Sequence, residues 1–205
     1  FKLVRSARIE MAAPLGGVFW KVGDTMKVQW LKGGQMFADE FEVYWSHDHF
    51  MSVAGQVPGT PAFDSSNNLF SLAWTIPDQI GTTTILVTNT LRNPVYAFSG
   101  DFDIAGNFTV THPNGDPAEP ELFALNKDTP SWDTIGSVSN VDLYYKYGST
   151  GAWTKINSTP LPNNPALPPT AVPSSGSWDP LPYTESATVL FRVQDSRYTN
   201  IFDGT

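Results

Sequence analysis

The chain has 205 residues, a length that fits one large domain or two of about 100 residues each. Its charged fraction is only 16%, and its net charge of −8 offers no basic stripe for phosphates, so we predict no nucleic-acid partner. The sequence has no cysteine and no apolar run approaching ~18 residues, which excludes a disulfide framework, a thiolate metal site, a cysteine nucleophile and a membrane span.

Short alternating segments, separated by Gly and Pro, run through the first half of the chain. Residues 8–12 are the first, and Met26, Val28 and Trp30 then alternate with polar neighbours, as in a half-buried strand. Four more segments of this kind follow: residues 39–48, 69–77, 82–89 and 100–106. Because no long amphipathic helix is visible, we predict about seven short strands in the first ~105 residues.

The second half repeats the first at a spacing near 100 residues. Three pairs of segments correspond: "FTVTHPNG" (108–115) with "IEMAAPLG" (9–16), "SNVDLYYKYG" (139–148) with "DEFEVYWSHD" (39–48), and "GSWDPLP" (176–182) with "LAWTIPD" (72–78). The distance from Trp74 to Ile85 equals that from Trp178 to Val189, which pairs Ile85 with Val189. One self-similarity at this period indicates two copies of one domain, with the border near Ala105.

Two antiparallel sheets packed face to face, with about seven strands per ~100 residues, describe an immunoglobulin-like sandwich. The predicted fold class is therefore all-β, with two tandem immunoglobulin-like β-sandwich domains at residues 1–105 and 106–205. Without cysteine, each core must depend on packing alone. The tryptophans assigned to the cores are Trp30, Trp45, Trp74 and Trp178, and those predicted to cap them are Trp20 and Trp132.

The stretch "GGVFWKVGDTMKVQW" (16–30) resembles the opening of secreted Ig-like repeats that read roughly P-N-G-G-E-x-W-x-V-G-D-T-x-x-I-x-W. Such repeats occur in bacterial and archaeal surface proteins of the S-layer type and in the Kre9/Knh1-type domain of fungal wall proteins. Residues 129–156 resemble the later part of the pattern, with Trp153 at its Thr-Trp position, whereas residues 116–128 depart from it. The resemblance implies an Ig-like fold and a role as stalk, adhesive module, surface-layer building block or accessory domain of a secreted enzyme.

Acidic residues gather near the predicted domain border. The candidate calcium ligands are Asp101, Asp103, Asp116, Glu119 and Glu121. Hard oxygen ligands at a junction would bind Ca²⁺ and stiffen it. The alternative is a solvated acidic edge that deters pairing with strands of other molecules. We expect no cofactor apart from this candidate calcium ion.

The segment "SHDHF" (46–50) carries two histidines two residues apart. A His-x-His pair binds zinc or copper when a third ligand arrives, so a metalloenzyme based on His47 and His49 is one hypothesis. The resemblance places the segment at a hairpin tip, where polar residues are ordinary, and we prefer that interpretation. No motif places a Ser or Asp with His112, so no catalytic residues are predicted.

These observations predict a non-enzymatic structural or assembly module, located outside the cell or on its surface, in a surface layer or surface polymer. Its expected partners are neighbouring domains of a longer polypeptide or identical subunits. The alternative is a carbohydrate-binding or spacer module of a secreted hydrolase, with a cell-wall glycan as ligand.

The two copies differ at their ends. Copy one closes with "AFSGDFDIAG" (97–106), whereas "IFDGT" (201–205) aligns with only the start of that segment, Phe202 with Phe98 and Gly204 with Gly100. The closing strand of the second sandwich is therefore expected from a continuation of the chain or from a neighbouring subunit.

Overall fold

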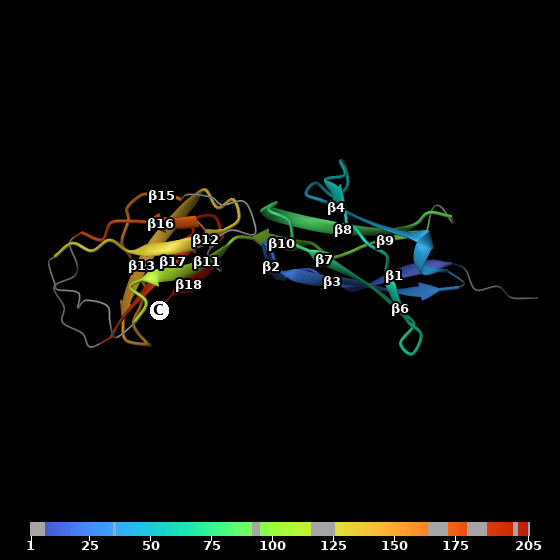
Figure 1. Cartoon of the computed structure of the whole chain (residues 1–205), viewed down its shortest axis with the longest axis horizontal. Coiled ribbons are helices and arrows are strands. Elements are labelled where there is room, and N and C mark those ends of the chain that lie inside the picture. Colours follow the sequence, from blue (N-terminus) through green and yellow to red (C-terminus); the bar gives the residue numbers. More distant parts are fainter. Residues whose placement is uncertain are drawn as a thin grey trace, which may run out of the picture. The chain divides into compact units, whose positions relative to one another are not determined.

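A computed structural model of the chain describes residues 7–34, 36–91, 95–115, 126–163, 172–179, 188–198 and 201–204. The chain divides into two compact units. Unit 1 comprises Phe1–Pro77 and Gly81–Ile104, and unit 2 comprises Asp78–Ile80 and Ala105–Thr205. Both units consist of short strands, coloured along the sequence in Figure 1.

The elements of the described residues include no long helix. The first group is β1 (Arg8–Ala13), β2 (Phe19–Lys21), β3 (Thr25–Gly33), the 3₁₀ helix η1 (Ala38–Glu40), β4 (Phe41–Ser46), β5 (Gly55–Gln56), β6 (Ala62–Asp64), β7 (Leu69–Thr75), β8 (Gly81–Asn89), β9 (Tyr96–Phe98) and β10 (Phe102–Ala105). The second group is β11 (Asn107–His112), β12 (Ser131–Ile135), β13 (Asn140–Tyr147), β14 (Thr154–Lys155), β15 (Leu161–Pro162), β16 (Val172–Ser175), β17 (Val189–Asp195) and β18 (Phe202–Gly204). Within the described ranges, no helix has the length and apolar character that crossing a bilayer requires.

Each unit is a sandwich of two sheets (Figure 1). In unit 1 the sheets have the orders β1-β3-β7-β6 and β2-β10-β8-β4-β5, with β9 also paired to β8. In unit 2 the orders are β11-β12-β16 and β14-β13-β17-β18, with β15 also paired to β13. The central strands β3, β8, β13 and β17 pair antiparallel with their neighbours. The prediction of an all-β protein with Ig-like sandwiches is confirmed.

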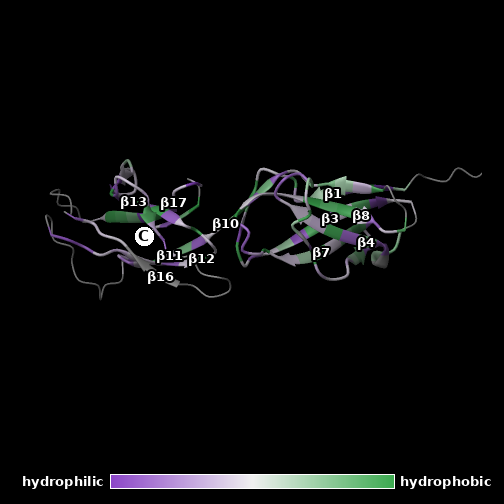
Figure 2. Cartoon of the chain, turned by 90° about the horizontal axis from the view of Figure 1, so that it is seen from above, coloured by the Kyte–Doolittle hydropathy of each residue, from purple (hydrophilic) through white to green (hydrophobic). Residues whose placement is uncertain are grey.

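The alternation seen in the sequence sets which side chains face the core. Hydrophobic and hydrophilic residues mix within the strands of both units (Figure 2), because successive side chains of a strand point to opposite faces. On β3, for example, Met26, Val28 and Trp30 are fully buried. The four tryptophans assigned to the cores lie in them, with exposed fractions between 0 and 8%: Trp30, Trp45, Trp74 and Trp178.

The two units share their strand registers. Met11 of β1 lies opposite Trp30 of β3, and Val110 of β11 lies opposite Trp132 of β12. In both ladders the register then shifts by a bulge, and a cis X-Pro bond follows it, at Pro14 and at Pro113. Trp132 therefore occupies in unit 2 the position that Trp30 has in unit 1.

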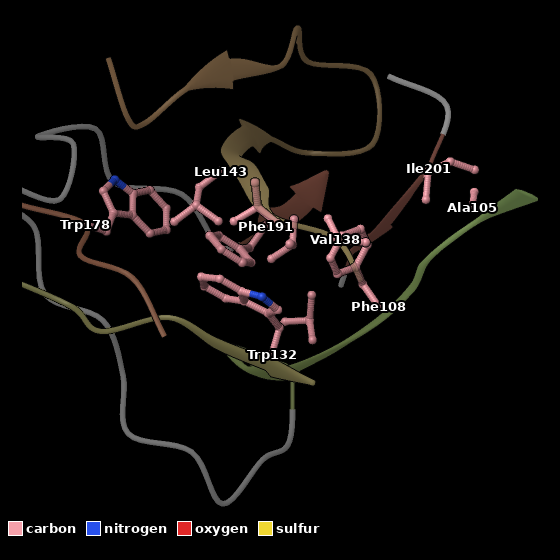
Figure 3. Packing of buried hydrophobic residues seen from close by; sticks show 11 residues of the cluster. Ala105, Phe108, Trp132, Val138, Leu143, Trp178, Phe191 and Ile201 are labelled. Atoms are coloured by element: carbon pink, nitrogen blue, oxygen red, sulfur yellow. The ribbon is translucent and has the colours of Figure 1, made fainter. Parts of the chain in front are cut away.

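This equivalence corrects the prediction that Trp132 caps the core. Trp132 is fully buried, and Figure 3 shows its indole ring pointing toward the same space as Leu143 and Phe191. The alternation that would place Trp132 in the core was hard to recognise, because β12 is only five residues long and Trp132 stands between Ser131 and Asp133. Only the pairing with β11 identifies it as the counterpart of Trp30.

The predicted pairing of Ile85 with Val189 is also wrong. Trp45 lies opposite Ile85 on β8, and its equivalent Tyr145 lies opposite Phe191 on β17, so Phe191 takes the place of Ile85. The error is two residues. A two-residue slip keeps the same side chains facing the core, so the alternating pattern cannot detect it.

Candidate functional site

The two histidines of the segment "SHDHF" have separate partners. His47 Nδ1 lies 2.9 Å from the carbonyl oxygen of Thr82, to which it donates, and His49 Nδ1 lies 3.5 Å from Asp101 Oδ1. His49 and Phe50 adopt positive φ angles of 53° and 64°, which a tight loop requires. Among the described residues, no group of three or more His, Asp and Glu side chains is arranged to bind a metal ion.

Asp48 organises this loop. Its carboxylate accepts hydrogen bonds from the Ser46 hydroxyl at 2.5 Å and from the hydroxyl and the amide of Ser52 at 2.6 and 3.0 Å. The Ser46 oxygen in turn accepts from the amides of Asp48 and Phe50. The hydrogen bonds from Ser46 and then Ser52 lower the pKa of Asp48 from 3.8 to about 2, since they favour the ionised carboxylate.

We expect the order of this loop to be lost in acid. Because the folded pKa of Asp48 is depressed, its stabilising contribution is present above about pH 4 and disappears as the pH falls through about 2. The amide resonance of Ser52 should titrate with a midpoint near pH 2 in an NMR series. The Asp48→Asn variant has no charge to lose, so its Ser52 amide should not follow this titration; the same midpoint in the variant would contradict the assignment.

The candidate calcium ligands are only partly described. Asp101 accepts a hydrogen bond from the Thr84 hydroxyl and Asp103 from the Thr82 hydroxyl, both at 2.7 Å, so each carboxylate is held by a threonine of β8. Asp116, Glu119 and Glu121 lie outside the described residues. The calcium site stays a prediction.

His112 has a partner that the sequence did not suggest. Its Nε2 lies 2.9 Å from Oδ1 of Asp128, and both side chains are largely buried, with exposed fractions of 24% and 11%. Asp128 also exchanges two backbone hydrogen bonds of 3.0 Å with Trp178. The pair therefore joins the end of β11 to the segment that positions Trp178, which is a structural role.

A cationic and aromatic cluster lies on the outer face of the sheet formed by β13, β17 and β18. The guanidinium of Arg192 lies 4.4 Å from the ring centroid of Trp153, 4.8 Å from that of Tyr144 and 4.9 Å from that of Phe202. Lys146 lies 4.9 Å from the Trp153 centroid. We call these five residues the Arg192 cluster.

Arg192 is held in this cluster by ring contacts. Among the described residues, no group accepts a hydrogen bond from its buried Nε, and desolvation lowers the pKa of its guanidinium. Cation–π attraction is strongest over Trp, so contact with the rings replaces part of the hydration that the guanidinium loses on burial. Phe202 remains 49% exposed. The sequence placed Trp153 only at the Thr-Trp position of the repeat pattern and did not predict the cluster, because its members come from separate strands and turns.

The edge of β17 next to this cluster is only partly paired. On one side, β13 pairs with all seven residues of β17, from Val189 to Asp195. On the other side, β18 pairs only with Arg192, Val193 and Gln194. Among the described residues no strand pairs with Val189 or Leu190 on that side. We call this unpaired side of Val189 and Leu190 the β17 edge. Val189 is 37% exposed.

No protein-family model matches the sequence, and no curated protein matches it. The crystal structure of bovine butyrophilin aligns over 96% of this chain and 96% of its own, with 9% identity and a TM-score of 0.42. The titin domains Z1Z2, solved in complex with telethonin, align over 99% of this chain and 95% of theirs, with 15% identity and a TM-score of 0.30. The α2-macroglobulin of E. coli aligns over 97% of this chain, which spans 13% of that protein, with 13% identity and a TM-score of 0.35. Likenesses at these scores carry no argument about function.

Proposed function

We propose that the chain is a non-enzymatic structural module of a surface layer or surface polymer, located outside the cell. Its units join to neighbouring units through strand pairing. The resemblance of residues 16–30 and 129–156 to secreted Ig-like repeats supports the location. The described geometry supports the assembly role.

The observation that carries the assembly role is the partly paired edge of β17. In unit 1 the equivalent strand β8 is covered on this side by β9 at Leu86–Thr88 and by β10 at Gly81–Thr83. An exposed row of backbone donors and acceptors is a template for another strand, and natural proteins rarely leave such an edge open. Pairing with a strand from a neighbouring unit satisfies these groups and joins the units.

The rival function, carbohydrate binding, is favoured by the Arg192 cluster. Aromatic rings on an exposed sheet face stack on sugar rings, and the cluster has three of them. The ring of Trp153, however, already has Arg192 and Lys146 close to it, at 4.4 and 4.9 Å from the ring centroid. This arrangement favours a structural role for Trp153 over that of a free platform, so the rival remains second.

Immunogold labelling of intact cells of the source organism tests the proposal. We expect label on the outside of unpermeabilised cells, in a repeating pattern, because a surface polymer presents many copies. Label that appears only after permeabilisation would contradict the extracellular role.

A glycan array tests the rival with the purified protein. The rival predicts saturable glycan binding that Trp153→Ala abolishes and that Phe63→Ala preserves, because Phe63 is an exposed aromatic residue of unit 1 outside the cluster. We expect no glycan ligand that discriminates between these two variants.

A further inference from the structure

The outer face of the sheet that contains β4, β8 and β9 carries exposed aromatic rings. Tyr44, Leu86 and Phe98 lie side by side across these three strands, and they point away from the core because the residues that alternate with Tyr44 and Leu86 are buried. The ring centroids of Phe50 and Tyr96 each lie 5.5 Å from that of Phe98. Tyr96 and Phe98 are 53% and 48% exposed, so apolar surface faces the solvent here. We call these five residues the unit 1 face.

Carboxylates border the unit 1 face. Glu42 accepts a hydrogen bond of 2.8 Å from the Tyr44 hydroxyl, and Asp101 and Asp103 accept hydrogen bonds from threonines of β8. The strands of this sheet that surround the face, β4, β5, β8, β9 and β10, contain no Lys or Arg. A basic side chain beside these carboxylates is that of His49, near Asp101. The unit 1 face is therefore apolar at its centre and acidic at its border.

The Arg192 cluster occupies the equivalent face of unit 2. Tyr144 lies opposite Arg192 as Tyr44 lies opposite Leu86, so a guanidinium stands where unit 1 has an aliphatic side chain. Lys146 adds a second cation from the same face of β13, since it is two residues from Tyr144. The same sheet face thus carries rings in both units, with acidic groups in unit 1 and cations in unit 2.

The remaining residues of the unit 2 face agree with this assignment. The pairing of β18 with β17 makes Phe202 the equivalent of Tyr96 on β9. This corrects the predicted match of Phe202 with Phe98, which is two residues away, a slip that leaves the alternation unchanged. Asp142 lies on the same face of β13, but its carboxylate is paired with Lys155 at 2.9 Å. It therefore does not cancel the two cations of the cluster.

We propose that the unit 1 face of one copy of this chain packs on the Arg192 cluster of a second copy. The two surfaces offer rings to each other, and their charges are opposite. A contact between two unit 1 faces would bring carboxylates together, and a contact between two clusters would bring cations together. The inference rests on the proposed assembly function and adds a second contact beside the β17 edge. Because the two surfaces differ and every copy carries both, the contact repeats head to tail from copy to copy.

Two variants test the contact by sedimentation velocity. Phe98→Lys replaces an exposed ring of the unit 1 face by a cation, and Phe202→Asp replaces an exposed ring of the Arg192 cluster by a carboxylate. Each should weaken self-association by about tenfold or more, since an apolar contact is lost and like charges meet. Phe63→Glu is the matched control, because Phe63 is an exposed ring of the other sheet and Lys32, 4.3 Å from its centroid, can pair with the new carboxylate. The control should associate as the parent chain does, and circular dichroism checks that all three variants are folded.

Mixing the two variants identifies which surfaces meet. Phe98→Lys retains its Arg192 cluster, and Phe202→Asp retains its unit 1 face, so each should be monomeric alone and the mixture should form complexes that contain both. This result also shows that the variants are folded at the retained surface. If only one of the two variants loses self-association, the contact joins two like surfaces and the proposal is wrong. If both are monomeric and remain so when mixed, the two surfaces do not meet and the proposal is equally wrong.

The parent chain separates this inference from the function on which it rests. If the parent stops at a dimer that both variants abolish and the mixture restores, the surfaces dock but the polymer function fails. If the parent and both variants form large assemblies alike, the assembly function survives and this inference is overturned. If the parent is monomeric at all concentrations, both are wrong.

Discussion

Replacing Trp132 by alanine is expected to lower the free energy of unfolding of unit 2 by about 3–5 kcal/mol, the range for deleting a large buried aromatic side chain. Trp132 is fully buried and belongs to a cluster that includes residues of both sheets and of the connections between strands: Ala105, Phe108, Val110, Val138, Val141, Leu143, Trp178, Phe191, Val193 and Ile201. Figure 3 shows Phe191 and Leu143 on one side of the indole ring, between it and β13. Alanine would leave a cavity between the two sheets, and a rigid core collapses into it only in part.

Denaturant unfolding followed by the fluorescence of the remaining tryptophans measures this loss. Trp153→Ala is the matched control, since it removes the same side chain from the outer face of the same unit, where Trp153 is only half-buried. The control should lose clearly less stability than Trp132→Ala. If the two variants unfold at the same denaturant concentration, Trp132 is not the centre of the core.

The second large effect is expected at Asn163, which is buried beside Trp132. Its side-chain oxygen accepts the indole N–H of Trp132 at 2.9 Å, and its Nδ2 donates to the Val138 carbonyl at 2.9 Å. The Thr134 hydroxyl lies 3.1 Å from the same nitrogen. Asn163→Ala would leave the indole N–H and the Val138 carbonyl buried without this partner, at a cost of about 1–3 kcal/mol for each group. A total loss of about 2–6 kcal/mol in the free energy of unfolding follows.

A double-mutant cycle with Trp132→Phe identifies the cause of that loss. Phenylalanine has no N–H, so Asn163→Ala should cost less in the Trp132→Phe background than in the parent chain. Chemical denaturation of the four proteins gives the coupling free energy, expected to be about 1–2 kcal/mol. Strict additivity would mean that the hydrogen bond to Trp132 contributes nothing and that Asn163 acts through Val138 and Thr134 alone.

Much of the fold could be predicted from the sequence because its signals are local. Alternation along β3 and β4 predicted strands and placed Trp30 and Trp45 in the core, since successive side chains of a strand must face opposite sides. The repeat near 100 residues predicted two similar sandwiches, and the match of residues 9–16 with 108–115 corresponds to one bulged ladder in each unit. These features follow from a few neighbouring residues and needed no knowledge of distant contacts.

The candidate site was beyond such local reasoning. The rings around Arg192 come from positions 144, 153 and 202, which are brought together only when β13, β17 and β18 form one sheet. The partner of His112 was missed for the same reason, because Asp128 lies outside any regular strand and carries no pattern of its own.

The sequence by itself determined the fold class, the strand content and most of the core of this protein, because the alternation of apolar and polar residues in a strand can be recognised from neighbouring residues alone. The tertiary structure alone decided that Trp132 is a core residue, that Phe191 and not Val189 is the equivalent of Ile85, and that the β17 edge is partly paired. The physical reason is common to all three. The register of a strand pair and the pairing of a strand edge depend on strands that are distant in sequence. A register shift of two residues leaves the apolar and polar alternation within each strand unchanged.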